Sequence, residues 1–141
     1  MSLNLAAPEA VGPESGGITM AHKRVLVVDD NVDVCALVAL KLESAGIEVE
    51  RRYDGISGLE LARASKFDAL IVDVEMPGIS GIELVTALRS DGDTVPVIMV
   101  SAKTHEREIA AGVEAGANDY LTKPFSPRDL LARVQALYAP A

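Results

Sequence analysis

Cysteine is almost absent from this 141-residue chain, which carries one thiol, at Cys35. A single cysteine cannot close an internal disulfide, so we expect a protein of the reducing cytoplasm. A chain of this length can bury a core that is stable without disulfides or a structural metal. Cys35 lies among Val34, Leu37 and Val38 at the spacing of one helix face. Because free cysteine is among the most buried residue types, we predict that Cys35 packs in the core.

Long apolar runs and basic clusters are also missing. The longest apolar stretches fall far short of the roughly 20 residues that a membrane span needs, and the N-terminal segment has neither a basic start nor an apolar signal core. The net charge is −8, the pI is near 4.7, and no run of Lys and Arg is longer than a pair such as Arg51-Arg52. Such a chain would repel a polyanion. We therefore expect a soluble protein that binds neither membranes nor nucleic acid directly.

The first 22 residues differ in composition from the rest of the chain. They are rich in proline, glycine, alanine and serine and have no periodic apolar face. We predict a flexible extension over residues 1–22, followed by one domain over residues 23–141. In that domain, short apolar runs alternate with segments of helical spacing, which indicates a parallel sheet wrapped by helices. The predicted strands are Val25–Val28, Ile47–Tyr53, Ala69–Asp73, Val95–Val100 and Tyr120–Thr122.

The hydrophobicity of these runs predicts their order in the sheet. Residues 25–28, 70–72 and 97–100 are apolar throughout, as strands covered on both faces must be, whereas residues 47–50 alternate and residues 120–122 are mixed. The second and fifth strands should therefore form the edges. This pattern fits an α/β, flavodoxin-like (βα)5 doubly wound parallel sheet with strand order 2-1-3-4-5.

Glycine and proline mark several helix ends. Gly46 and Gly116 stand where the first and fourth helices should end in a left-handed cap. Ser126 followed by Pro127 is typical of an N-cap with proline at the first helical position. The last helix is therefore predicted to begin at Pro127.

Acidic, hydroxyl and amino side chains follow the predicted strands where they end. These are Asp29, Asp30, Asp73, Ser101 and Lys123, and ligands of open parallel sheets bind just beyond the carboxyl ends of the strands. Each close pair of carboxylates would repel by about 4 kcal/mol at an effective dielectric near 20, so a cation is needed there. Ligands that are all oxygen favour Mg²⁺ as the cofactor, with Mn²⁺ as the alternative. The hydroxyl and the ammonium suit the oxygens of a phosphate.

Asp73 is the best placed nucleophile of this set. It leaves a central strand directly into the Pro-Gly loop at residues 75–78, which we expect to leave it exposed at the edge of the sheet. A carboxylate beside a divalent ion and an ammonium can attack phosphorus, because the two cations absorb charge on the transferring oxygens. The product would be an aspartyl phosphate.

Four short motifs carry these residues in a fixed order. They are Val27-Val28-Asp29-Asp30-Asn31, Ile71-Val72-Asp73 with Met76-Pro77-Gly78, Val100-Ser101-Ala102, and Asp119-Tyr120-Leu121-Thr122-Lys123-Pro124-Phe125. Any one of them is a weak signal. The ordered set resembles the receiver domain of bacterial two-component response regulators, over roughly residues 23 to 138.

The resemblance implies a role for each matching residue of the site. Asp73 matches the phospho-accepting aspartate, Asp30 a direct Mg²⁺ ligand, and Asp29 a metal partner that acts largely through water. The backbone carbonyl of Glu75 would be the remaining protein ligand of the metal. Lys123 matches the lysine that contacts the phosphoryl group.

The resemblance also implies a conformational switch. Ser101 matches a hydroxyl that moves to meet the phosphoryl group, and Tyr120 matches an aromatic ring that turns inward behind it. The Lys123-Pro124 bond is expected to be cis, which is otherwise rare, at about 5% of X-Pro bonds.

The function implied is that of a signalling switch, not a turnover enzyme. A sensor histidine kinase or a histidine phosphotransfer protein would donate the phosphoryl group to Asp73, and self-phosphorylation and self-dephosphorylation would be the only chemistry. A downstream protein would read the change on the face formed by the fourth helix, the fifth strand and the fifth helix. Glu75 and Lys103 are further predicted to lie on opposite sides of the opening through which water reaches the phosphoryl group, and so to slow the loss of phosphate.

Three alternatives remain open at this stage. A receiver-like interaction module would keep the fold without being phosphorylated. An aspartate-nucleophile phosphatase of the haloacid-dehalogenase kind would place its two aspartates two residues apart after the first strand, whereas Asp29 and Asp30 are adjacent. A flavodoxin-type FMN binder needs glycines and hydroxyls in its first loop, where these acids would repel a phosphate.

Overall fold

Strands and helices alternate along the chain in the computed structural model, which describes residues 23–102 and 106–138. The predicted extension at residues 1–22 and Lys103 lie outside the described residues. The elements are β1 (Arg24–Val28), α1 (Val32–Glu43), β2 (Glu48–Arg52), α2 (Gly55–Ala64), β3 (Ala69–Asp73), α3 (Gly81–Ser90), β4 (Val97–Ser101), α4 (Glu106–Ala115), β5 (Asp119–Thr122) and α5 (Pro127–Leu137). Of the helices in this described part, none has the length and apolarity that crossing a membrane requires.

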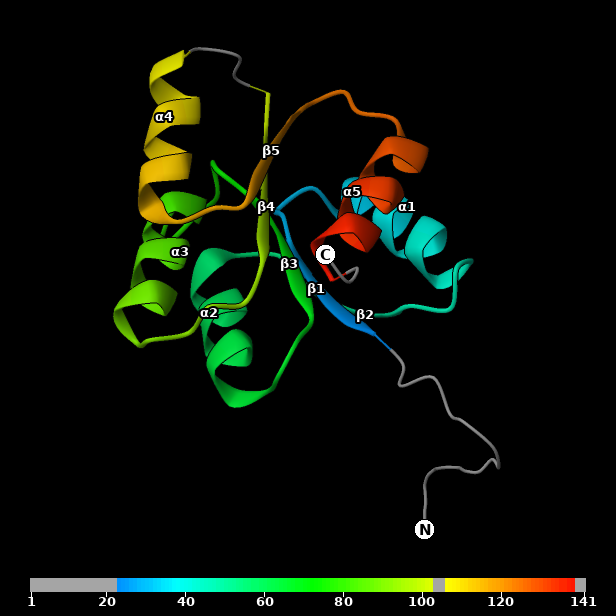
Figure 1. Cartoon of the computed structure of the whole chain (residues 1–141), viewed down its shortest axis with the longest axis horizontal. Coiled ribbons are helices and arrows are strands. Elements are labelled where there is room, and N and C mark those ends of the chain that lie inside the picture. Colours follow the sequence, from blue (N-terminus) through cyan, green and yellow to red (C-terminus); the bar gives the residue numbers. More distant parts are fainter. Residues whose placement is uncertain (1–22, 103–105, 139–141) are drawn as a thin grey trace, which may run out of the picture.

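The strands form one parallel sheet in the order β2-β1-β3-β4-β5 (Figure 1). The predicted order is confirmed, and β2 and β5 are the edge strands as expected. In the register, Val28 pairs with Val72, and Asp73 pairs with Val100. The residues that follow β1 therefore emerge beside the last residue of β3, which brings the candidate acids together at the carboxyl ends of the central strands.

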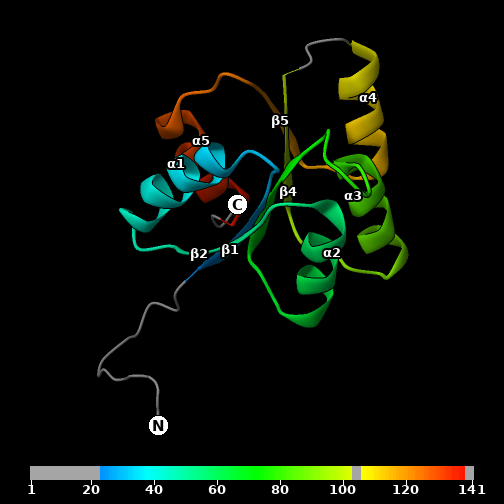
Figure 2. The same ribbon diagram turned by 180° about the vertical axis from the view of Figure 1, so that it is seen from behind.

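Helices cover both faces of the sheet. Helices α1 and α5 lie on one face, and α2, α3 and α4 lie on the other (Figures 1 and 2). The residues of β3 and β4 are all buried, as are the last four of β1. Burial on both faces explains why these strands read as continuous apolar runs, since no position in them faces water.

Helix α1 confirms one prediction and corrects another. Cys35 is fully buried, and its thiol donates a hydrogen bond to the backbone carbonyl of Asp29 at 3.3 Å. The buried stripe of α1 is Cys35, Val38, Ala39 and Leu42, which has the i, i+3, i+4, i+7 spacing of a single helix face. Leu37 falls outside this stripe and is 45% exposed, so the prediction that it shares the buried face was wrong.

Local hydrogen bonds make two strands begin later than predicted. The amide of Ile47 bonds to the carbonyl of Leu42 in the turn after α1, so β2 begins one residue later. The amide of Val95 bonds to the Asp93 side chain, and β4 begins only at Val97. Apolar composition alone predicts neither limit, because the residues beyond it are also apolar.

The predicted helix-end signals are confirmed. Gly46 and Gly116 have φ values of 83° and 114°, a region in which residues with a Cβ are strained. The Ser126 side chain accepts a hydrogen bond from the amide of Asp129, and Pro127 is the first residue of α5. These ends fix where the chain returns to the sheet after α1 and α4.

Candidate functional site

Three carboxylates meet at the carboxyl ends of β1 and β3. Asp29, Asp30 and Asp73 each offer an oxygen, and these oxygens all lie within 4.8 Å of one another. The adjacent Asn31 caps α1, since its side chain accepts hydrogen bonds from the amides of Asp33 and Val34. Because Asn31 satisfies the start of the helix, the two aspartates before it are not needed as the cap.

The carboxylates differ in exposure, and one prediction about them was wrong. Asp73 was expected to be exposed, but only 6% of its surface is accessible, and Asp29 is 2% accessible. The reason is the packing around its carboxylate, which lies beside Asp29, the ammonium of Lys123 and the backbone amide of Glu75. Asp30 is exposed, so solvent reaches the cluster from the side of Asp30.

Lys123 lies between the two buried acids. Its Nζ is 2.8 Å from Oδ2 of Asp29 and 3.6 Å from Oδ2 of Asp73. The Lys123-Pro124 bond is cis, as predicted, and the amide of Lys123 bonds to the carbonyl of Ser101 at 2.8 Å. Burial disfavours the ammonium, but the hydrogen bond to Asp29 and the two nearby charges outweigh it and raise the pKa of the lysine. The ammonium is therefore kept charged beside both carboxylates.

The Asp73 carboxyl is harder to ionise than an ordinary aspartate. Burial and the charge of Asp29 are the main causes that raise its pKa, from 3.8 to about 6. The charge of Lys123 and a hydrogen bond from the backbone amide of Glu75 act in the opposite direction. Asp73 is still mostly ionised at neutral pH, which a nucleophile requires.

Ser101 and Tyr120 lie on the same face of the sheet. Ser101 ends β4 and is 1% exposed, and Tyr120 on β5 pairs with Met99, two residues earlier on β4. Side chains two apart on a strand share a face, and both belong to the face that α4 covers. A Cβ on Gly112 of α4 would lie 3.5 Å from the Tyr120 ring, so the ring packs against this helix.

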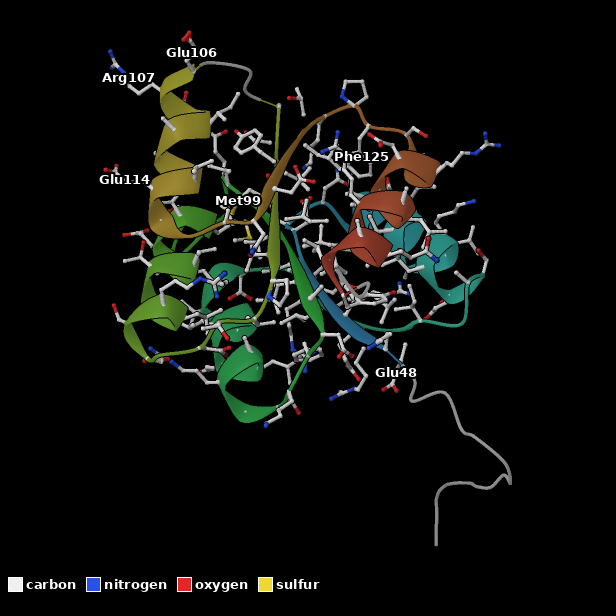
Figure 3. The ribbon with its side chains drawn as sticks, viewed as in Figure 1. Glu48, Met99, Glu106, Arg107, Glu114 and Phe125 are labelled. Atoms are coloured by element: carbon white, nitrogen blue, oxygen red, sulfur yellow. The ribbon has the colours of Figure 1, made fainter. Side chains whose placement is uncertain are left out.

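Helix α4 buries little of its surface against the sheet. Gly112 is its one buried residue among those described. Glu106, Arg107 and Glu114 point away from the sheet, while Met99 lies between the sheet and the helix (Figure 3). A helix with so few buried apolar contacts can shift at a small cost in free energy.

The donor set fits a hard divalent cation. Three carboxylates face one ammonium within the cluster, so a divalent ion would balance the remaining negative charge. Oxygen is the ligand atom that Mg²⁺ prefers, and two of the three acids are held in place by burial. The carbonyl of Glu75 stays a predicted ligand, and the predicted pairing of Glu75 with Lys103 involves a residue outside those described.

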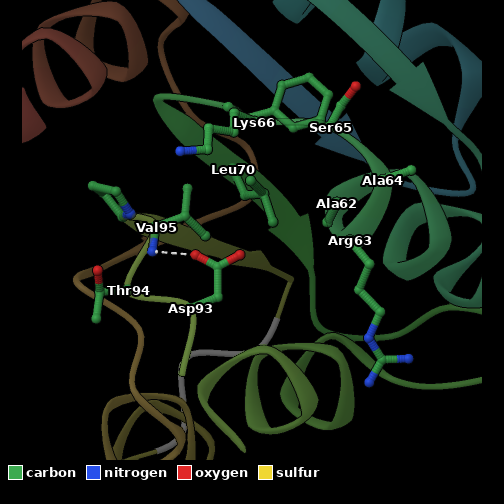
Figure 4. Close-up of a pocket in the computed structure, with 11 residues that line it drawn as sticks. Ala62, Arg63, Ala64, Ser65, Lys66, Leu70, Asp93, Thr94 and Val95 are labelled. Atoms are coloured by element: carbon green, nitrogen blue, oxygen red, sulfur yellow. Dashed lines mark hydrogen bonds between the residues drawn. The ribbon is translucent and has the colours of Figure 1, made fainter. Parts of the chain in front are cut away.

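A separate cavity of about 590 Å³ lies at the opposite end of the strands, where β3 and β4 begin. It is formed by the end of α2 and the segments that lead into β3 and β4, including Arg63, Lys66 and Asp93 (Figure 4). None of the residues predicted for the site lines it. The acidic cluster instead lies at the carboxyl ends of the strands, where parallel sheets bind ligands.

Sequence reasoning missed Gly55 and Gly81, which begin α2 and α3. A Cβ on Gly55 would overlap the backbone of Ile79, in the loop after Asp73, and a Cβ on Gly81 would overlap the carbonyl oxygen of Asp73 itself. The available signal was a glycine in the first turn of a helix, since glycine is a poor helix former. Such a glycine indicates a close approach of backbone.

Comparison with known proteins identifies the family. The family model described as "Response regulator receiver domain" matches residues 25–135. The response regulator MprA of Mycobacterium ulcerans (strain Agy99) is 43% identical over 114 residues, which are 81% of this chain and 49% of that protein. The Francisella response regulator 1452 receiver domain has a TM-score of 0.80 at 36% identity and covers 83% of this chain and 97% of its own. Chemotaxis protein CheY4 of Vibrio cholerae has a TM-score of 0.78 at 36% identity, with coverages of 83% and 99%.

The chain therefore belongs to the response regulator receiver domain family of two-component systems. Its fold is that of the CheY-like receivers, with five parallel strands in the order 2-1-3-4-5. The chain spans about half the length of the curated relatives that it matches.

Proposed function

We propose that this protein is a phospho-accepting switch whose acceptor is Asp73 and whose cofactor is Mg²⁺, with Mn²⁺ able to replace it. The donor would be a phosphohistidine of a sensor histidine kinase or of a histidine phosphotransfer protein. The observation that carries the proposal is the position of Asp73, buried beside Asp29, Asp30 and the ammonium of Lys123. A structural cluster would have no need to bury so much uncompensated negative charge.

Each residue of the cluster has a defined task in this proposal. Asp29, Asp30 and the carbonyl of Glu75 would hold the ion together with Asp73. The bound ion would neutralise negative charge on the transferring phosphoryl oxygens. An oxygen of Asp73 forms a bond to phosphorus while the bond from phosphorus to the donor imidazole nitrogen breaks, and the imidazole keeps that electron pair. Lys123 and the Ser101 hydroxyl then bind oxygens of the new aspartyl phosphate.

Phosphorylation would act on a pre-existing equilibrium between two conformations. The phosphoryl group can shift that equilibrium only through contacts that differ between the two states. Ser101 at the end of β4 and Tyr120 against α4 supply such contacts, and the slight burial of α4 supports a change there. A downstream protein partner would read the change on the face of α4, β5 and α5.

Beryllofluoride, which stands in for the phosphoryl group, is expected to bind only with Mg²⁺ present and to change more than the site. Amide chemical shifts should change at the acidic cluster and also over residues 101–115 and 119–136. Two-dimensional amide spectra measure this directly. Changes confined to the loops of Asp29, Asp30 and Asp73 would rule out a switch on that face. Asp73→Asn is the control and should show no beryllofluoride-dependent shifts.

The proposed role is that of a switch in the cytoplasm, without turnover of small phosphoesters. An aspartate-nucleophile phosphatase would release phosphate from such esters many times per molecule. We expect no release above background in a phosphatase assay with Mg²⁺ in excess.

A further inference from the structure

The loop that follows Asp73 is held between the first turns of two helices. We call residues 74–80, which join β3 to α3, the acceptor loop. At its base, the amide of Gly81 bonds to the carbonyl of Val74 at 2.8 Å. At its tip, the amide of Gly55 in α2 approaches the carbonyl of Pro77 at 3.5 Å. The loop is therefore supported at its base by the first residue of α3 and at its tip by the first residue of α2.

Both of these helices begin with glycine because there is no room for a side chain at that position. Neither Gly55 nor Gly81 is among the glycines with positive φ, so their backbone conformation is open to other residues. A Cβ on Gly81 would overlap the carbonyl oxygen of Asp73. A Cβ on Gly55 would overlap the carbonyl oxygen of Ile79 and lie 2.6 Å from its Cγ1. The helix backbones thus approach the loop as closely as only glycine permits.

Helix α2 offers the loop a firm support. The Asp54 side chain caps it by accepting hydrogen bonds from the amide and the hydroxyl of Ser57, at 2.8 Å and 2.7 Å. Gly55 itself is buried, and Ile79 packs against the core on the same face of the sheet. A group added at Gly55 would therefore displace the acceptor loop more readily than the helix.

We propose that Gly55 is a positioning residue for the metal site, because it seats the tip of the acceptor loop and so orients Asp73 and Glu75. The inference rests on the proposed function, since it concerns the ion that Asp73 and Glu75 would hold. The amide of Glu75 already bonds to the Asp73 carboxylate, so a tilt of the loop changes both groups together. Mutation of a residue that orients the metal ligands without binding the metal itself typically lowers metal affinity by about 10-fold to 100-fold.

The test compares metal affinity with stability in two loop-seat variants, Gly55→Ala and Ile79→Ala, which alter the two sides of the contact between α2 and the acceptor loop. Gly55→Ala is expected to weaken Mg²⁺ binding by about 10-fold or more, measured by isothermal titration calorimetry and by Mn²⁺ paramagnetic resonance. Ile79→Ala removes the loop's side of the contact without a clash and should also weaken binding. Gly46→Ala is the matched control, because Gly46 has a φ of 83° and open space around it in the turn before β2. It should lower the melting temperature yet leave Mg²⁺ affinity within about twofold of the wild type.

The outcomes separate this inference from the function on which it rests. Wild-type binding of Mg²⁺ that Asp30→Asn weakens would support the metal site itself. If the wild type binds Mg²⁺ and both loop-seat variants bind it within about twofold of the wild type, the positioning role is overturned while the metal site stands. Equal weakening in Gly46→Ala would also overturn it, since the effect would then follow stability alone. If the wild type does not bind Mg²⁺, the proposed function and the inference fail together. If the amide spectrum shows that Gly55→Ala is unfolded, Ile79→Ala decides.

Discussion

Replacing Asp73 with asparagine is expected to abolish phosphoryl labelling of this protein by acetyl phosphate or a phosphohistidine donor. The asparagine amide has nearly the same shape but no negative charge, so it is a very poor nucleophile. Asp29 is not positioned to replace it, because its carboxylate already binds Lys123 and the amide of Asn31. The label should be sensitive to hydroxylamine, as an acyl phosphate is, and should require a divalent ion.

A remote aspartate provides the control for this experiment. Asp119 lies at the start of β5 and forms an ion pair with Arg133 at 2.8 Å, away from the acidic cluster. Asp119→Asn should be labelled at the wild-type level. Removal of the metal with a chelator should stop labelling of both the wild type and Asp119→Asn. Labelling of Asp73→Asn at the wild-type level would show that the acceptor has been misassigned.

The same substitution is expected to stabilise the metal-free protein at neutral pH. Burial and Asp29 raise the pKa of Asp73 from 3.8 to about 6, so the folded state disfavours the charged form that the unfolded state accepts readily. The shift of about two units corresponds to a loss on the order of 2–3 kcal/mol in the free energy of unfolding, once the group is ionised. Asp73→Asn removes this charge and should recover most of that loss.

The pH dependence of the effect follows from the direction of the shift. Between pH 3.8 and about 6 the folded protein holds a proton that the unfolded chain has released, so stability falls as pH rises through this window. Below the window both states are protonated, and the variant should differ little from the wild type. Above it, the variant should be the more stable of the two by a constant amount.

Urea unfolding followed by circular dichroism at several pH values measures this difference. Adding Mg²⁺ should stabilise the wild type at neutral pH, because an ion that binds only the folded state adds its binding free energy. The asparagine variant should gain less from Mg²⁺, since it has lost one carboxylate ligand. A difference in unfolding free energy between variant and wild type that stays constant from about pH 3.5 to about pH 7.5, roughly the span of the titration, would contradict the expected charge effect.

The sequence by itself determined the sheet and the identity of the clustered side chains. Strands such as β3 and β4 are buried on both faces, so each of their positions has to be apolar, and this constraint is visible without coordinates. The strand order then places the end of β1 beside the end of β3, which is why the meeting of Asp29 with Asp73 could be predicted. The family resemblance added the cis bond before Pro124, a rare geometry that composition alone does not indicate.

Only the tertiary structure decided how exposed and how charged the site is. Asp73 was expected to be exposed, yet it is buried, with its carboxylate beside Asp29 at the end of β1 and the ammonium of Lys123 after β5. Lys123 is closer to Asp29 than to Asp73. Both facts depend on contacts between segments far apart in the sequence, whereas sequence patterns report mainly which face of an element is buried. Burial and distance set the pKa of a carboxylate, so the electrostatics of this site follow from the packing.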